Sequence, residues 1–259
     1  MRNNDHTFVV CAYKDSPFLE ECILSLLHQS IKTKIILYTS TPSDYIRNIC
    51  KKFSIPMFIG TGGSIGKDWN NALSFVDTKY ATIAHQDDVY QERYLERVHK
   101  NFLKSKNNLI VYTNYREWKN GTIIRLNANL KIKKIMLLTL SMFPSSNFWR
   151  KGILAFGNPI CCPAVSYNME ILSDFRFNET MKVSLDWLAW YEISKYSGRF
   201  SYISEELVLH RIHENSETTN TISDNTRTKE DIYMFYKFWP KKIADLIMKV
   251  YIKSQNTNE

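Results

Sequence analysis

Glycine is scarce in this chain, with 8 among 259 residues, and long apolar runs are absent. The best run, 135–143, is interrupted by Thr139 and Ser141, whereas a membrane-spanning helix needs about 20 predominantly apolar residues. The first six residues lack the apolar stretch of a secretory signal peptide. These absences exclude collagen-like and membrane-spanning chains, and we expect a cytoplasmic protein.

Cysteine pairing and nucleic-acid motifs are also missing. The five cysteines are odd in number and show no zinc spacing, and Cys161 and Cys162 are adjacent, so we expect reduced, mostly buried thiols. The net charge of +8 favours an anionic partner. Because no zinc knuckle, RNA-recognition motif or helix-turn-helix pattern is found, we expect no nucleic-acid partner. Phosphorylated small molecules and an anionic membrane surface remain.

What is present begins with alternation of strand and helix patterns over the first hundred residues. Short apolar runs predict buried strands, and apolar residues at helical spacing predict the helices between them. The predicted strands are 7–12, 34–38, 57–59, 80–84 and 109–115, and the predicted helices are 18–27, 42–53, 65–76 and 91–103. This alternation indicates an α/β fold, with a mostly parallel sheet flanked by helices and ligands at the carboxyl ends of its strands.

The second half is less regular. Its predicted elements are helices at 131–140 and 185–196, a loop at 158–168 leading into a strand, strands at 200–203 and 207–211, and a polar loop at 214–228. The tail from Lys229 mixes aromatic residues with lysines. It predicts amphipathic helices that lie on a membrane surface or, alternatively, pack on the main domain.

The acidic pair Asp87-Asp88 directly follows the predicted strand 80–84. Two carboxylates in that place suit Mg²⁺ or Mn²⁺, which proteins bind through one or two carboxylates together with substrate phosphates. Asp88 with Gln91 also fits a helix capping box. Both interpretations can hold, because one carboxylate can cap while its neighbour binds metal.

The glycine-rich segment 60–67 matches neither a phosphate loop nor a dinucleotide fingerprint. A phosphate loop would need glycine and a hydroxyl residue where Thr61 and Asp68 stand, and Ile65 occupies the third glycine place of the dinucleotide pattern. The segment can still let backbone approach a ligand. A helix then begins near Lys67, and helix N-termini favour anions.

Two further motifs carry polar groups that could act in chemistry. Asp186 beside Trp187 suits a sugar site, but an acidic residue in a first helical turn can simply favour the helix dipole. His210, Arg211 and His213 could bind a diphosphate or complete a metal shell, and they could equally be a solvated face.

In this order, the motifs resemble the inverting family 2 glycosyltransferases with the GT-A fold. Segment 8–30 is similar to their first strand and helix, and 65–73 to the loop and helix that contact the nucleotide. Segment 86–90 is similar to their Asp-x-Asp-type motif. Leu185-Asp186-Trp187 occupies the place of their Glu-Asp pair, and 210–213 with Ser216 matches a closing segment whose His reaches the diphosphate. The resemblance runs from residue 7 to about 216.

The resemblance implies a metal-dependent hexosyltransferase of bacterial surface polysaccharide synthesis. It would move a sugar from a nucleotide-diphosphate donor, expected to be a UDP-sugar, to a hydroxyl of a glycan or lipid-linked acceptor. Mn²⁺ or Mg²⁺ at Asp88 and His213 would assist, and Asp186 would be the catalytic base. Donor contacts are expected at Ala12, Tyr13, Thr39, Lys67, Asp68, Asn70, Asp87, Arg211 and His213, and acceptor contacts at Trp187, Cys162 and Pro163.

The implied organisation is a GT-A domain over 1–216, with a nucleotide-binding half (about 1–105) and an acceptor half (about 106–216), followed by the loop and basic helical tail 217–259. The tail would contact the inner membrane surface. The chain departs from the family in having His85 and Leu185 where acidic residues are common. It also has 38–41 in place of an Asp pair that contacts the base, which would shift base recognition to hydroxyls and backbone.

Two alternatives remain. A GT-A-like sugar nucleotidyltransferase usually has a glycine-rich loop after the first strand, which segment 12–15 lacks. A non-catalytic module that binds nucleotide sugars or glycans is disfavoured by the intact carboxylates Asp87, Asp88 and Asp186.

Overall fold

The computed structural model describes residues 5–119, 121–124, 127–213 and 226–256. The strands in this part of the chain are β1 (His6–Ala12), β2 (Lys34–Thr39), β3 (Met57–Ile59), β4 (Tyr80–His85), β5 (Val89–Tyr90), β6 (Asn108–Lys119), β7 (Thr122–Ile123), β8 (Val165–Asn168) and β9 (Arg199–Ile212). The helices are α1 (Leu19–Leu27), α2 (Asp44–Phe53), α3 (Ile65–Ser74), α4 (Tyr94–Lys104), α5 (Ala128–Leu140), α6 (Asn147–Leu154), the 3₁₀ turn η1 (Cys162–Ala164), α7 (Leu185–Ile193), α9 (Thr226–Phe238) and α10 (Lys241–Asn256).

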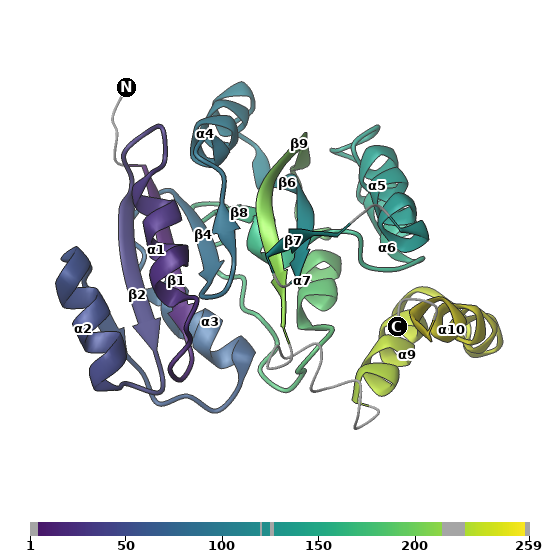
Figure 1. Ribbon diagram of the computed structural model, residues 1–259. Coiled ribbons are helices and arrows are strands. Elements are labelled where there is room, and N and C mark those ends of the chain that lie inside the picture. The colour runs from purple at the N-terminus through teal and green to yellow at the C-terminus, as the bar shows by residue number, and fades with distance from the viewer. Residues whose placement is uncertain (1–4, 120, 125–126, 214–225, 257–259) are drawn as a thin grey trace.

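The strands form one sheet in the order β3-β2-β1-β4-β8-β6-β9-β5, with β7 paired to β6 (Figure 1). β1, β2, β3 and β4 are parallel, and so are β6 and β9. β8, β5 and β7 run against their neighbours. The predicted α/β fold with a mostly parallel sheet is confirmed.

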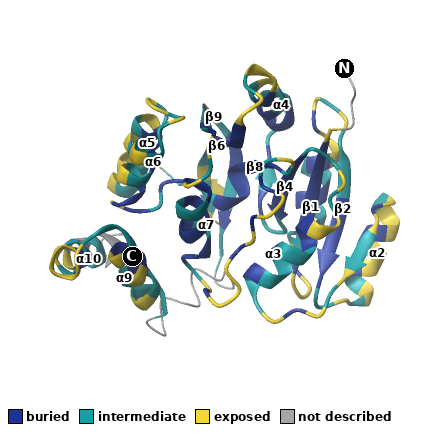
Figure 2. Cartoon of the chain, turned by 180° about the vertical axis from the view of Figure 1, so that it is seen from behind, coloured by how far each residue is buried: buried dark blue, intermediate teal, exposed yellow. Residues whose placement is uncertain are grey.

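Helices cover both faces of this sheet because the buried strands alternate apolar side chains between two cores. Phe8 and Val10 of β1 pack with α1, α2 and α4 on one face. Val9 packs on the other face, in a core shared with α3, α5, α6, α7, α9 and α10. The strands are largely buried, and exposed residues lie on the outer sides of the helices (Figure 2).

The second half differs from its prediction in its long-range pairing. The two predicted strands at 200–203 and 207–211 are one strand, β9, which follows β6 through register shifts and also pairs with β5. Helix α6 and strands β5 and β7 were not predicted. Most of the predicted polar loop 214–228, including the boundary at 216, lies outside the described residues, and the division into halves and tail stays a prediction.

The tail packs on the rest of the chain, in agreement with the second alternative. Met234 and Phe235 are fully buried in the same core as α7. The Glu230 carboxylate accepts the backbone N–H groups of Lys182, Val183 and Ser184 just before α7. These contacts use much of the tail's apolar surface. Among the helices described, none has the length and apolar character to span a membrane.

Candidate active site

Polar residues follow three neighbouring parallel strands at one edge of the sheet. In the β1 register Ala12 lies opposite Thr39 of β2, and Cys11 lies opposite His85 of β4. The strand ends are tied together, since the Gln86 amide exchanges two hydrogen bonds with the backbone of Tyr13. This edge is where ligands of parallel α/β sheets bind.

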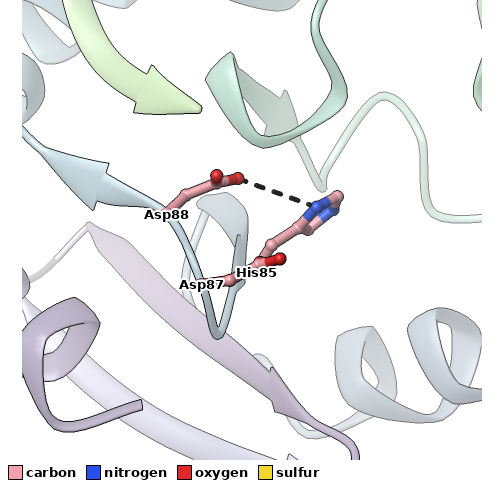
Figure 3. Close-up of side chains that lie close together, drawn as sticks. All are labelled: His85, Asp87 and Asp88. Atoms are coloured by element: carbon pink, nitrogen blue, oxygen red, sulfur yellow. Dashed lines mark ion pairs between the residues drawn. The ribbon is translucent and has the colours of Figure 1, made fainter. Parts of the chain in front are cut away.

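The group after β4 is built around a fully buried Asp88. Ligand atoms of His85, Asp87 and Asp88 lie within 4.8 Å of one another, and Asp88 faces His85 (Figure 3). Asp88 Oδ1 accepts from His210 Nδ1 (3.0 Å) and from the Arg211 backbone N–H (2.9 Å). β5 intervenes before α4 begins at Tyr94, so the capping-box interpretation of Asp88 is wrong.

Two buried polar atoms of this group are unsatisfied within the described residues: Asp88 Oδ2 and His85 Nε2. His85 Nδ1 lies 3.8 Å from Asp88 Oδ2, which is too far for a hydrogen bond. Leaving buried polar atoms without partners is costly, and in native structures a bound water or ion usually satisfies such atoms. The donor set, two carboxylates and one imidazole, therefore fits a divalent cation.

Neighbouring imidazoles set the charges here. Burial disfavours the imidazolium, yet the Asp88 carboxylate outweighs it and raises the pKa of His210 to about 9. Burial also disfavours the Asp87 carboxylate, but the hydrogen bond from His213 keeps the pKa of Asp87 below its ordinary value. Burial lowers the pKa of His85. The site thus favours the ionised form of the Asp87 carboxylate and the neutral form of the His85 imidazole.

Arg211 and His213 serve this group differently from the prediction. Arg211 is only 9% exposed, its guanidinium lies between Phe18 (4.2 Å) and Trp118 (4.0 Å), and it pairs with Glu21. It braces the site rather than facing a diphosphate, which corrects its predicted donor contact. His213 Nε2 donates to Asp87 Oδ2 (2.9 Å), so it supports that carboxylate, and His85 rather than His213 lies with the two carboxylates in the group that could hold a metal ion.

The start of α3 packs on other parts of the chain and also places a carboxylate at the end of β2. A Cβ on Gly66 would lie 2.0 Å from the Asn178 carbonyl oxygen, so this glycine admits protein backbone rather than a ligand. The Asn70 amide binds Phe177 backbone and Glu179, which corrects its predicted donor role. Asp68 accepts from Tyr38 Oη and Ser40 Oγ, at the end of β2.

Asp186 lies in the first turn of α7. Its Oδ1 accepts the Trp187 backbone N–H (2.7 Å) and its Oδ2 accepts from Asn158 Nδ2 (2.8 Å). Burial raises the pKa of Asp186 to about 6, although these two hydrogen bonds oppose the rise. A carboxylate with a pKa this close to neutrality suits proton transfer.

Cys161 and Cys162 feel the charge of both carboxylate sites. Burial raises the pKa of both thiols, and the Asp88 and Asp186 carboxylates both raise it further, which places each thiol within electrostatic reach of both. Asp88 and Asp186 therefore border one region. The sequence predicted both carboxylates, and only the tertiary structure brings them to the same place.

The side chains of the predicted acceptor contacts are buried. Trp187 is 1% exposed, and its indole N–H donates to the Leu154 carbonyl, so the ring is a core side chain and not a platform for a sugar. Cys162 and Pro163 are also buried. Among the remaining predicted donor contacts, Ala12 and Thr39 are buried and Tyr13 is exposed. Lys67 extends toward the Gly63 backbone, and these four roles stay predictions.

A cavity of about 240 Å³ lies beside the site, between β6, β7 and α5, and its lining includes Tyr115, Glu117 and Lys133. Lys133 Nζ donates to Tyr115 Oη (3.3 Å), and the Tyr115 ring lies 6.3 Å from that of His210. The Lys133 charge also lowers the pKa of Asp186. The cavity thus adjoins both carboxylate sites.

A family model, glycosyl transferase family 2, matches residues 7–170. The chain belongs to that family.

The structure of this family 2 glycosyltransferase resembles solved GT-A enzymes. Residues 1–349 of S. aureus TarS in complex with UDP-GlcNAc match with a TM-score of 0.68 and 14% identity, over 96% of this chain and 71% of that one. The Pyrobaculum calidifontis mannosyltransferase PcManGT, in complex with GDP-Man and Mn²⁺, matches with a TM-score of 0.66 and 13% identity, over 94% and 69%. These likenesses show the GT-A fold. No curated protein matches the sequence.

The sequence analysis of this glycosyltransferase did not predict how three residues would serve the two carboxylate sites. His85 was noted only as a departure from the family, although its place beside the acidic pair was a signal. His210 and Asn158 each support a carboxylate from 122 and 28 residues away in the chain. No local pattern connects residues so far apart.

Proposed function

We propose that this glycosyltransferase moves a hexose from a nucleotide-diphosphate donor, a UDP-sugar, to an acceptor hydroxyl with inversion of the anomeric carbon. The observation that supports the proposal is the pair of carboxylate sites whose charges both act on Cys161 and Cys162. The site after β4 has unsatisfied ligand atoms, and the pKa of Asp186 is raised to about 6.

His85, Asp87 and Asp88 would hold Mn²⁺ or Mg²⁺, which supplies Lewis-acid stabilisation of the leaving diphosphate when bound. Hydrogen bonds within the chain preorganise this metal site. His210 and the Arg211 backbone fix Asp88 Oδ1, which leaves Oδ2 free for a cation. His213 holds Asp87 in its ionised form.

Asp186 removes the proton from the acceptor hydroxyl as that oxygen attacks the anomeric carbon. Trp187 N–H and Asn158 fix the carboxylate orientation, and general-base assistance typically contributes about 10²–10⁴-fold. The neighbouring thiols of Cys161 and Cys162 stay protonated because their pKa values are raised. A protonated, buried thiol is a poor nucleophile, which favours a single displacement over a covalent intermediate.

Asp68 is our proposed contact for the donor base. The family's usual Asp pair is absent from the end of β2, but Tyr38 and Ser40 draw the Asp68 carboxylate to that strand end. A carboxylate there can accept an N–H of the base. Uracil and guanine both offer one, and the two solved relatives were obtained with UDP-GlcNAc and GDP-Man.

The acceptor enters, in this proposal, through the cavity beside Tyr115 and Lys133. Lys133 is a half-buried cation, and no ion pair within the described ranges includes it. It would suit an acceptor carrying a phosphate or carboxylate, as bacterial surface glycans and lipid-linked intermediates do. Lys133→Met should raise the acceptor KM severalfold and leave donor affinity unchanged.

The decisive experiment screens nucleotide sugars by thermal shift with Mn²⁺, because a ligand that binds only the folded state raises its stability. NMR of the product then reads its anomeric configuration. Inversion with release of a nucleoside diphosphate supports the proposal. Retention contradicts it, release of pyrophosphate indicates a nucleotidyltransferase, and binding without hydrolysis or transfer indicates a non-catalytic module.

A further inference from the structure

Helices α5 and α6 carry exposed residues on the side away from the sheet (Figure 2), and an unusual number of them are apolar. The residues of this surface, the α5–α6 face, are Ile132, Ile135, Leu138, Met142, Phe143, Phe148 and Phe156. Phe148 is 87% exposed and Ile135 is 62% exposed. Isolated exposed apolar residues are normal, but a cluster of this kind marks an interaction site.

Helix α5 is apolar on two opposite sides. Leu137 and Leu140 are buried in the core, whereas Ile132 and Ile135 point the other way, as expected from helical spacing. Protein packing accounts for the first side. Nothing in the described chain covers the second side, so its apolar character is unexplained by folding.

The chain segment that carries this face has basic but no acidic residues. Residues 118–169 contain no Asp or Glu and seven basic residues: Lys119, Arg125, Lys131, Lys133, Lys134, Arg150 and Lys151. Lys131 is exposed on the apolar side of α5. None of the ion pairs found among the described residues includes Lys131, Lys134 or Lys151.

Arg150 holds the α5–α6 connection in place. It is fully buried, and its guanidinium donates to the backbone carbonyls of Pro144, Ser194, Tyr196 and Gly198. Phe143 packs edge-on against Trp149 at the same tip. The exposed aromatic residues are thus presented on a fixed support, so they need no refolding to become available.

We propose that the α5–α6 face docks on the surface of an anionic lipid bilayer. Apolar and aromatic side chains among lysines are the composition of an interfacial helix, which inserts its apolar residues while its cations meet the headgroups. A symmetric dimer through this face would bring two basic surfaces together, and juxtaposed like charges disfavour association. The charge therefore favours the bilayer over a second copy.

This contact is separate from the tail, whose buried residues bind the core. It also has a consequence that rests on the proposed function. Lys133 and Leu137, on the inner side of α5, line the cavity. Docking through the outer side would hold that cavity roughly 10 Å from the headgroups, which is about one helix diameter. A lipid-linked acceptor would present its hydroxyl near the headgroups and so within reach of the cavity.

The test is sedimentation of the full chain with phosphatidylcholine vesicles, with and without phosphatidylglycerol. The probe variant is Phe148→Ser with Ile135→Ser. The matched control is Leu103→Ser, because Leu103 is also 62% exposed but lies on α4, whose buried residues belong to the opposite core. Unfolding temperatures verify folding. We expect binding to anionic vesicles that the probe variant weakens by about tenfold or more and the control leaves unchanged.

Lys131→Gln provides a second variant that leaves every apolar side chain in place. It should weaken anionic binding about fivefold, and added salt should weaken it further. The proposal is overturned if the wild type does not bind, or if Leu103→Ser weakens binding as much as the probe variant. It is equally overturned if sedimentation velocity shows a dimer that the probe variant dissociates while vesicles are not bound. Because vesicle binding requires no sugar transfer, its failure is distinguishable from failure of the proposed reaction.

Discussion

Asp88 and Asp186 are chemically identical side chains that border the same region, yet their surroundings prepare them for different work. Asp88 lies among imidazoles, with His210 and a backbone N–H on one oxygen and no hydrogen-bond partner on the other within the described chain. Asp186 lies at the start of an apolar helix, and burial raises its pKa to about 6.

The difference teaches that neighbours, rather than residue type, separate a cation-binding carboxylate from a proton acceptor. Nearby positive charge and hydrogen bonds favour the ionised form, whereas desolvation disfavours it. A carboxylate that holds a cation should stay charged at all working pH values. A base works best when its pKa approaches the pH of the reaction.

The largest expected effect comes from Asp186→Asn, which keeps the shape but cannot accept the proton. Transfer should fall by about 10²–10⁴-fold, while donor affinity stays near wild type. Glu192→Gln on the same helix is the matched control, because Glu192 makes only an exposed pair with Lys195. A transfer assay beside calorimetric titration of the donor separates the two quantities. Full transfer by Asp186→Asn would remove this residue from the chemistry.

A smaller effect, on metal affinity, is expected when the His210 imidazole that supports Asp88 is removed. His210→Ala removes the hydrogen bond to Asp88 Oδ1 without removing a ligand. Loss of such a partner typically lowers metal affinity by about 10–100-fold. Titration of Mn²⁺ in the presence of UDP measures this loss, and Asp88→Asn should exceed it. Unchanged Mn²⁺ affinity in both variants would leave the group after β4 without a role in metal binding.

The pH profile sharpens the contrast. Because protonated Asp186 cannot act as a base and its pKa is about 6, kcat/KM should fall about tenfold per pH unit below that value and level off above it. The Asp87 carboxylate, whose pKa lies below its ordinary value, should stay ionised throughout this limb. A profile that remains flat down to pH 4 to 5, roughly the ordinary range of carboxyl groups, would contradict the assignment.

The smallest expected effect is a shift of the acidic limb of the pH profile. The hydrogen bond from Asn158 lowers the pKa of Asp186, so Asn158→Ala should move the acidic limb to higher pH. Activity should then decline severalfold near pH 6 and recover at alkaline pH, roughly as expected for losing one hydrogen bond to a charged group. A uniform loss at every pH would show instead that Asn158 only maintains the structure.

Much of the first half could be predicted from sequence because its structure is local. Each parallel strand there is followed by a helix that covers it, so short apolar runs and helical periodicity are enough. The same logic located Asp87 and Asp88, since a polar pair after a buried strand must lie at the sheet edge. The same local reasoning failed in predicting that Asp88 caps a helix, because β5 pairs with β9, a strand more than a hundred residues away.

By itself the sequence determined the α/β class, the order of the family motifs and the two carboxylates to which the proposal assigns roles, because each depends on neighbours within a few residues. Only the tertiary structure decided which side chains surround them. It stacked Arg211 between Phe18 and Trp118, buried Trp187 and made His85 the third ligand candidate. The physical reason is that burial, charge and hydrogen bonding act through space, and the partners that set them come from distant parts of the chain.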